Sequence, residues 1–441
     1  MMDKIFLKTF GCKANQYDSQ FIRESLGEKG YQFTEDSQQA DVCIINTCTV
    51  TARSDNKVAS FVKKCNQGGR KKQCIITGCA VSRKSHAFNS HQETIHVVDN
   101  FRKHTLASVL RNIKNGSMVR NHSTIDASGD HFEQVSINAQ KISSFHNHDR
   151  VFVKIQDGCD RYCSYCIVPD VRGAPRSKKL MQVYNEVADL VKNGFVEVVL
   201  TGINLGLFGA DLQRKNALVD LLRDISGIPG LKRIRLSSLE VDLISEELIE
   251  FLVLNEKMCH HLHIPLQSGS NRILAKMNRK YTKENFLNKI EAIKRKIKDF
   301  CFTTDVIVGF PGESEHDFNE TIEVVKINEF SKVHVFPFSY REGTSVQSFL
   351  QERLSHTLVK ERVKALVTVS QEVSCLLKQK YIGKKVDILV ESKREKKSNF
   401  LQGMTIHYLR VLIDGPDSLC GKIISVKLLA LRNDCLVGVV L

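Results

Sequence analysis

Three cysteines near the middle of the chain stand at a spacing that suits metal chemistry. Cys159, Cys163 and Cys166 form the pattern C-x-x-x-C-x-x-C, and they follow an alternating apolar run at residues 151–155 that predicts a short buried strand. Thiolates are soft ligands, typical of iron–sulfur clusters and of zinc. A closed zinc site takes four protein ligands, whereas this loop offers neither a histidine nor a fourth cysteine. The pattern therefore favours a 4Fe-4S cluster with one iron open to a substrate or cofactor.

Three further cysteines each come directly after a predicted strand in the first 114 residues. Cys12, Cys48 and Cys79 stand in the contexts FGCKANQ, INTCTV and TGCAV. Parallel strands open on one crevice at their carboxyl ends, so these thiols are expected to converge on a second cluster site. The alternative is that strand-to-helix turns merely favour small residues. Three other cysteines fall inside predicted elements, where a small buried thiol needs no further explanation: Cys43, Cys65 and Cys74.

Both cysteine sets lie in regions where predicted strands and helices alternate. Over residues 1–114 this alternation indicates a small parallel sheet covered by helices, and no G-x-G-x-x-G follows the first strand. Over residues 149–372, six strands separated by helical stretches predict an open, partial α/β barrel. The fold class is therefore α/β. The predicted strands lie at 5–10, 42–46, 73–77 and 95–98 in the first region, and at 151–155, 196–200, 233–236, 261–264, 302–308 and 333–336 in the second.

Polar or glycine-rich loops follow the predicted barrel strands. Gly202 lies in a loop where a backbone could approach a ligand closely, and Ser237 and Glu240 offer a hydroxyl and a carboxylate suited to a ribose and an amine. Gln267 follows the next strand. Since the loops after barrel strands form sites together, these residues predict one ligand pocket beside the cysteine loop.

Residues 115–148 are polar and without periodicity, which indicates a linker between the first two regions.

The pattern of the last 69 residues predicts a different kind of domain, which follows a helix predicted at 352–380. Short apolar strands at 386–390, 405–413, 423–429 and 436–440 then predict a small antiparallel barrel of OB type. Residues 376–399 hold eight Lys or Arg against three acidic residues, a density that suits a phosphate backbone.

Composition narrows the class of protein. The formal charge is +15, from 64 basic minus 49 acidic residues, which suggests a polyanionic partner such as RNA. Residues 1–10 do not resemble a signal peptide, and no run of 18 apolar residues occurs, so we expect neither secretion nor membrane association. In the reducing cytoplasm, fourteen cysteines are better explained by metal chemistry than by disulfides.

The motifs together resemble one enzyme family. The C-x-x-x-C-x-x-C loop is similar to the signature of radical S-adenosylmethionine (SAM) enzymes, and KIQDGC, RGAPRS, LTGIN, RLSSLE and MNRKYT resemble blocks of its methylthiotransferase branch. The resemblance covers nearly the whole chain. It implies an N-terminal domain at 1–114, a linker at 115–148, a radical SAM core at 149–372 and an RNA-binding TRAM barrel at 373–441.

The resemblance implies a role for each residue singled out above. One 4Fe-4S cluster would chelate SAM at its open iron and cleave it to a radical, and an auxiliary 4Fe-4S cluster would carry the sulfur that is delivered. The implied ligands are Cys159, Cys163 and Cys166 for the first cluster and Cys12, Cys48 and Cys79 for the second. The implied candidates for SAM contacts are Gly202, Ser237, Glu240 and Gln267.

The same resemblance implies a substrate and partners. Branches of the family act on N6-isopentenyladenosine in tRNA, on N6-threonylcarbamoyladenosine in tRNA, or on a ribosomal protein. The motifs are most similar to the threonylcarbamoyladenosine branch, which implies C2-methylthiolation of that nucleoside at position 37, beside the anticodon. An electron donor such as a flavodoxin or ferredoxin system, and a sulfur donor of unknown identity, would complete the reaction. A non-catalytic RNA-binding protein with structural zinc is the alternative of another class.

Metal content separates these two classes. We predict that anaerobically reconstituted protein is brown and holds about eight irons per chain, since two cubanes of four are expected. Iron and acid-labile sulfide analysis measures this directly. A colourless protein that contains zinc would contradict the iron–sulfur interpretation and support the structural-zinc alternative.

Overall fold

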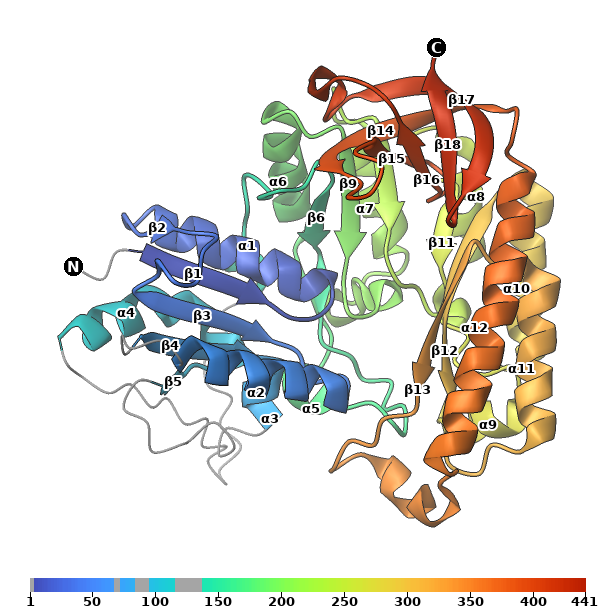
Figure 1. The fold of residues 1–441 in the computed structure, drawn as a ribbon, viewed down its shortest axis with the longest axis horizontal. Helices are drawn as coiled ribbons and strands as arrows, with labels where there is room; N and C mark the ends of the chain where they lie inside the picture. Colours follow the sequence, from blue (N-terminus) through green and yellow to red (C-terminus); the bar gives the residue numbers. More distant parts are fainter. Residues whose placement is uncertain (1–3, 67–71, 84–94, 116–136) are drawn as a thin grey trace.

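The computed structural model describes residues 4–66, 72–83, 95–115 and 137–441 (Figure 1). The predicted linker therefore lies partly outside the described residues. Its described part packs on the first helix, because the backbone N–H groups of Ser143 and Ser144 donate to the Glu24 carboxylate at 2.7 and 2.9 Å. No helix within the described ranges combines the length and the apolar character needed to cross a membrane.

The N-terminal part is a five-stranded parallel sheet in the order β2-β1-β3-β4-β5. Every residue of β3 is buried, and its side chains alternate between two apolar layers. Val42 and Ile44 pack with residues of α1 and α4, whereas Cys43 and Ile45 pack with residues of α2. Cys65 and Cys74 lie in that second layer as buried thiols, as predicted. The elements are β1 (Lys4–Thr9), α1 (Lys13–Gly27), β2 (Gln32–Phe33), β3 (Val42–Thr47), α2 (Ala52–Asn66), β4 (Gln73–Gly78), α3 (Cys79–Arg83), β5 (Ile95–Val97) and α4 (Leu106–Lys114).

Six parallel strands with covering helices form the predicted open barrel. Two three-stranded sheets, β6-β9-β10 and β11-β12-β13, meet through a bridge between Ser238 and His263, where Leu239 N–H donates to the His263 carbonyl at 3.0 Å. No strand pair among the described residues joins β6 to β13, so the barrel is open on that side. Strands β1 and β3 point toward the barrel with their carboxyl ends (Figure 1). The strands are β6 (Val151–Lys154), β9 (Glu197–Thr201), β10 (Arg233–Leu236), β11 (His261–His263), β12 (Cys301–Val308) and β13 (Lys332–Pro337).

Helices cover the outer face of this barrel, and α10, α11 and α12 lie side by side at the right of Figure 1. Capping residues set where several of them begin. Thr282 and Ser314 each form a capping box at the start of α10 and α11, and Ser355 caps α12. The bounds are α5 (Val168–Arg172), α6 (Leu180–Lys192), α7 (Ala217–Ser226), α8 (Glu246–Leu254), α9 (Asn271–Lys276), α10 (Lys283–Lys296), α11 (Glu315–Asn328) and α12 (His356–Gln379).

The C-terminal part is a closed five-stranded barrel of the predicted OB type, in the order β14-β15-β16-β18-β17. Two details of the prediction are wrong. Strands β16 and β18 pair in parallel, whereas an antiparallel barrel was expected. Residues 405–413 hold the end of β15, a tight turn and β16 rather than one strand. Tyr408 has a φ of +63°, and the Thr405 hydroxyl accepts a hydrogen bond from Leu409 N–H at 3.0 Å. The turn carries no glycine, so the sequence gives no usual turn signal. The strands are β14 (Lys385–Arg394), β15 (Leu401–Thr405), β16 (Arg410–Ile413), β17 (Ile423–Arg432) and β18 (Cys435–Val440).

The C-terminal barrel docks at the amino ends of the open barrel's strands through an arginine. The buried Arg235 guanidinium donates to the Thr405 carbonyl at 3.0 Å, to the Ile406 carbonyl at 3.2 Å and to Glu197 at 2.9 Å. The ring of Tyr408 lies under this guanidinium, with the Arg235 carbon 5.1 Å from the ring centre. Docking at this end leaves the carboxyl ends of the strands free for chemistry.

We predict that Arg235→Met destabilises the protein strongly, because the buried Glu197 would lose its hydrogen-bonded partner and keep only Arg233, at 3.7 Å. Leaving one charge of a buried pair unpaired costs about 3–5 kcal/mol. Urea-induced unfolding measures the change, and Arg223→Met is the matched control. Arg223 pairs with Asp220 on the surface, so its loss should change the free energy of unfolding by less than about 1 kcal/mol. Equal effects of the two substitutions would contradict this role of Arg235.

Candidate active site between two cysteine sets

The structure brings Cys12, Cys48 and Cys79 together, as their positions after three neighbouring strands predicted. Cys12 precedes α1, Cys48 follows β3 and Cys79 begins α3. Burial, together with the nearby Cys12 and Cys79 thiols, raises the pKa of the Cys48 thiol to about 11. The three thiols therefore lie near one another at the carboxyl edge of the sheet.

Polar side chains of the cysteine motifs lock the three strand ends against each other. The Asn15 amide donates to the Phe10 and Thr47 carbonyls, at 2.8 Å each. The Thr47 hydroxyl donates to the Thr77 carbonyl at 2.6 Å and accepts from Ala80 N–H at 3.2 Å. The asparagine of G-C-x-x-N and the threonine of N-T-C thus fix the loops that carry the thiols.

Two glycines allow the backbone to come this close. Gly11 has a φ of +120°, and a Cβ there would lie 2.8 Å from both Cys48 Cβ and the Asn15 amide nitrogen. Gly78 has a φ of +96°, and a Cβ would lie 2.5 Å from the Thr47 carbonyl oxygen. Both positions require glycine, because the backbone has a positive φ there and because a side chain would collide with its neighbours.

The second thiol loop is closed by a short antiparallel ribbon at the end of the first barrel strand. Strand β7 (Gln156–Asp157) pairs with β8 (Arg176–Ser177), and Cys159 N–H donates to the Gly173 carbonyl at 3.0 Å. Gly158 has a φ of +76°, and a Cβ there would lie 2.0 Å from the Ala174 carbonyl oxygen. Burial raises the pKa of Cys159 to about 11. Cys159, Cys163 and Cys166 are all half-buried.

An arginine that sequence reasoning missed joins this loop to Glu240. The Arg279 guanidinium donates to Cys163 Sγ at 3.3 Å and pairs with the Glu240 carboxylate. Burial raises the pKa of Glu240, and the charge of Arg279 offsets part of this rise. Arg279 lies in the MNRKYT motif, but the motif alone does not show which of its side chains points toward the thiol loop.

The other predicted contact residues lie around the same loop. Gly202 is approached by the Gln156 side chain, whose oxygen would lie 2.8 Å from a Cβ at position 202. The Ser237 hydroxyl and the Asn204 side-chain nitrogen are buried without a hydrogen-bond partner within the described residues. Unpaired buried polar atoms are costly, so these two groups suit a ligand that would pair with them, such as a ribose hydroxyl. Gln267 has a φ of +62°, held by backbone bonds to β12.

One cavity lies where the two thiol-bearing regions meet. It has a volume of about 190 Å³ and lies between the loop after Cys48, the loop of Cys166, and strands β12 and β13. Cys166 itself lines the cavity, and from the N-terminal side Val50 and Thr51, two and three residues after Cys48, line it. Ile167, directly after Cys166, packs against Cys79 in a small buried apolar group. The loops of both thiol sets therefore contribute residues to one hollow. Its lining includes Val50, Thr51, Cys166, Gln267, Asp305, Ile307, Phe336 and Phe338.

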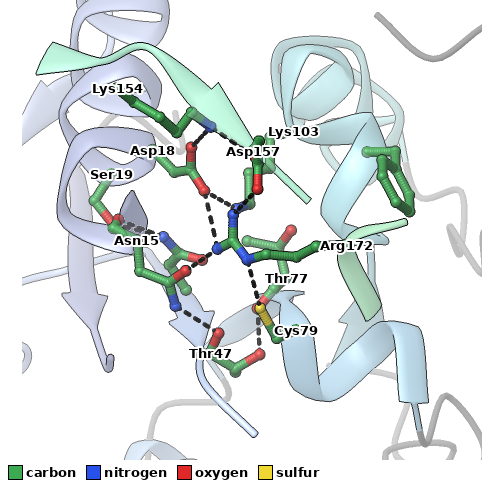
Figure 2. A network of polar contacts seen from close by, with 12 residues as sticks. Asn15, Asp18, Ser19, Thr47, Thr77, Cys79, Lys103, Lys154, Asp157 and Arg172 are labelled. Carbon is green, nitrogen blue, oxygen red and sulfur yellow. Dashed lines mark hydrogen bonds and ion pairs between the residues drawn. The ribbon is translucent and has the colours of Figure 1, made fainter. Parts of the chain in front are cut away.

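A buried network of five charges ties the N-terminal sheet to the thiol loop of the barrel (Figure 2). Asp18 of α1 pairs with Lys103 at 2.6 Å and also with Lys154 of β6. Arg172, at the end of α5, pairs with Asp157 at 2.7 Å and donates to Cys79 Sγ at 3.2 Å. All five side chains are at most 8% exposed.

The three cations of this network keep both carboxylates ionised. Burial alone would raise the pKa of Asp18, but Lys103, Lys154 and Arg172 outweigh burial and hold the pKa below its ordinary value. Arg172 and Lys154 act in the same way on Asp157. At Lys103 burial lowers the pKa, Arg172 and Lys154 lower it further, and Asp18 raises it. The network thus sets three cationic side chains against two carboxylates.

The donor chemistry of the site fits iron–sulfur clusters. Each set offers three thiols on glycine-shaped loops, and each set has an arginine N–H directed at a sulfur atom. Hydrogen bonds to cluster sulfurs are one of the ways in which proteins tune such clusters. A partial barrel with three thiols on the loop after its first strand defines a radical SAM enzyme, whose cofactors are SAM and a 4Fe-4S cluster.

Comparison with known proteins gives the family. Residues 153–325 match the description "Radical SAM superfamily", and residues 4–99 match "Uncharacterized protein family UPF0004". The "Threonylcarbamoyladenosine tRNA methylthiotransferase MtaB" of Bacillus subtilis is 33% identical, over 97% of this chain and 94% of its own length. The "tRNA-2-methylthio-N(6)-dimethylallyladenosine synthase" of Alkaliphilus oremlandii is also 33% identical, over 99% of this chain and 93% of its own. The chain belongs to the radical SAM methylthiotransferase family.

A solved structure supports the fold alone. The radical S-adenosylmethionine methyltransferase TsrM from Kitasatospora setae superposes with a TM-score of 0.54 at 14% identity, over 76% of this chain and 75% of TsrM. The α/β architecture predicted from the sequence, including its radical SAM barrel, is confirmed.

We predict that Gly11→Ala removes most of the iron from the N-terminal thiols, because the new methyl group would press on Cys48 and Asn15. The measurement uses a background in which Cys159, Cys163 and Cys166 are alanine, where about four irons per chain are expected before the change. Gly30→Ala is the matched control. Gly30 also has a positive φ, +84°, but a Cβ there meets nothing within 4 Å. Equal iron loss in both variants would show that backbone strain, rather than crowding of the thiols, is responsible.

Proposed function

We propose that this enzyme methylthiolates C2 of N6-threonylcarbamoyladenosine at position 37 of tRNA. Cys159, Cys163 and Cys166 would hold the cluster that binds SAM, and Cys12, Cys48 and Cys79 would hold an auxiliary 4Fe-4S cluster. When bound, these groups would supply a radical that removes the hydrogen of an aromatic C–H bond and the sulfur that replaces it, and a second SAM would supply the methyl group of that sulfur. The observation that carries the proposal is the cavity lined by Cys166 and by the residues that follow Cys48, with Cys79 packed beside it on Ile167.

The polar floor of that cavity supports the threonylcarbamoyl side chain. Asp305 lines the cavity, and its carboxylate lies 3.2 Å from His263 Nε2. One atom each of His263, Asp305 and His334 lies within 4.8 Å of the others. Burial lowers the pKa of His334, and the charge of Lys13, beside Cys12, lowers it further. A threonylcarbamoyl group carries a hydroxyl that could donate to the Asp305 carboxylate and a carboxylate that could accept from a ring N–H of His334, whereas an isopentenyl group can use neither.

The walls of the cavity favour a second candidate. Ile307, Phe336 and Phe338 are apolar, and they would suit the isopentenyl group of N6-isopentenyladenosine. The relatives whose names state a dimethylallyladenosine product are about as similar to this chain as those whose names state threonylcarbamoyladenosine. The polar floor is the observation that separates the two substrates.

A basic groove supports RNA as the carrier of the substrate. It has a volume of about 980 Å³ and runs between the C-terminal barrel and residues 147–152. Six basic residues line it against three acidic ones, so the groove attracts a phosphate backbone. Its charged residues are Asp149, Arg150, Glu391, Lys393, Arg394, Glu395, Lys396, Lys397 and Arg410.

Three further assignments belong to the proposal. Gly202, Ser237, Glu240 and Gln267 would contact SAM, and the unpaired Ser237 hydroxyl supports its part of this assignment. The chain would divide into domains at 1–114, 149–372 and 373–441, and the five-stranded sheet, the two three-stranded sheets and the closed barrel fall within these three ranges in turn. A flavodoxin or ferredoxin system would supply electrons.

We predict that digested tRNA from a deletion strain lacks 2-methylthio-N6-threonylcarbamoyladenosine and keeps its precursor. Mass spectrometry of nucleosides measures both, and the wild-type gene should restore the product. A His334→Phe gene should restore at least about tenfold less, because a hydrogen bond to a charged group is worth about 1.5–3 kcal/mol. His316→Phe is the matched control and should restore most of the product, because His316 is exposed on α11 and does not line the cavity.

Two outcomes would contradict the assignment. Loss of the methylthio form of N6-isopentenyladenosine, with the threonylcarbamoyl form intact, would select the second candidate. An unchanged tRNA profile together with a lost modification on a ribosomal protein would show that the substrate is a protein rather than RNA.

A further inference from the structure

Arg172 belongs to one thiol loop and touches the other thiol set. It follows Cys166 by six residues, yet its Nε–H donates to Cys79 Sγ at 3.2 Å (Figure 2). Its remaining two nitrogens are also used, one by Asp157 at 2.7 Å and the other by the Asn15 side-chain oxygen. The side chain is 1% exposed. Since all three guanidinium nitrogens donate hydrogen bonds, the group is held in one orientation, and its Nε–H stays directed at the sulfur.

Within the five-residue network beside Cys79, cationic side chains outnumber carboxylates by three to two. Lys103, Lys154 and Arg172 are positive, and Asp18 and Asp157 are the carboxylates that pair with them. Both carboxylates accept bonds from two or more cations, whereas only Arg172 of the three cations bonds to a sulfur atom. An excess of one positive charge in a buried site favours an anionic group beside it.

We propose that Arg172 is a positioning residue that sets the reduction potential of the N-terminal cluster, by donating a hydrogen bond to the Cys79 sulfur and compensating the charge of the cluster. This inference rests on the proposed function, in which Cys79 ligates that cluster. Reduction adds one negative charge to the cluster. A hydrogen bond to its sulfur and a nearby buried cation stabilise that charge, so both raise the potential. The barrel loop thereby controls how readily the N-terminal site accepts an electron.

Replacement of Arg172 by lysine tests the inference. Lysine keeps the positive charge, but its single nitrogen cannot reproduce the three hydrogen bonds that the separate guanidinium nitrogens donate to Cys79, Asp157 and Asn15. The measurement is the midpoint potential of full-length protein with Cys159, Cys163 and Cys166 replaced by alanine, titrated with dithionite and followed by electron paramagnetic resonance. We expect Arg172→Lys to shift the reduction equilibrium at least tenfold toward the oxidised form, about 59 mV for one electron. The spectrum of the reduced cluster should change as well.

Lys103→Met is the matched control for charge. The Lys103 nitrogen contacts Asp18 at 2.6 Å but no sulfur, so its loss removes one positive charge of the same network without removing a bond to Cys79. We expect a shift in the same direction but smaller than that of Arg172→Lys. A second variant, Arg172→Gln with Asp157→Asn, removes the bond to sulfur while the net charge of the network stays the same, and it should also lower the potential.

The outcomes separate this inference from the proposed function. An N-terminal site that binds no iron even with Arg172 present would overturn the proposed function itself. A cluster that forms in all variants with one unchanged potential would overturn the inference alone. Loss of the cluster in both Arg172 variants, with or without a lowered thermal unfolding midpoint, would show that Arg172 holds the site together rather than setting its potential, and it would also overturn the inference.

Discussion

The buried network of Asp18, Lys103, Lys154, Asp157 and Arg172 is the constraint on which the arrangement of the molecule depends. Buried charges are costly unless every partner is in place, so the helix, strand and loop that carry these residues must meet in one geometry. Asp18 comes from α1, Lys154 from β6 and Arg172 from the loop after the first barrel strand. The pairing turns the carboxyl edge of the N-terminal sheet toward the open side of the barrel (Figure 1).

This orientation brings the two thiol sets near each other, because both the N-terminal sheet and the barrel carry their thiols at the carboxyl ends of parallel strands. Carboxyl ends of parallel strands are where α/β proteins place ligands, and loops that follow two such edges here line one cavity. The C-terminal barrel docks at the opposite ends of the barrel strands, through Arg235, and therefore leaves this cavity open. A basic groove beside that barrel and a polar floor under the cavity then suit a phosphate backbone and a polar base substituent.

Much of the fold could be predicted from local pattern. Strands such as residues 42–47 show a continuous apolar run before a cysteine, and the rule that parallel strands share one edge brought Cys12, Cys48 and Cys79 together without coordinates. Arg172 and Arg279 could not be found in this way, because their partners Cys79 and Glu240 lie far away in sequence. The hairpin at Tyr408 was missed since its strained turn uses neither glycine nor proline. The five-charge network was missed for the same reason as the arginines, since only folding brings its members together.

Anomalous diffraction at the iron edge, from crystals of anaerobically reconstituted protein, tests the central claim most directly. Two iron sites should flank the cavity lined by Thr51, Cys166 and Gln267, one beside Cys79 and one beside Cys163, close enough for a single base to lie between them. Iron sites that open into separate compartments, or iron at only one thiol set, would contradict the account of two cysteine sets acting on one bound nucleoside.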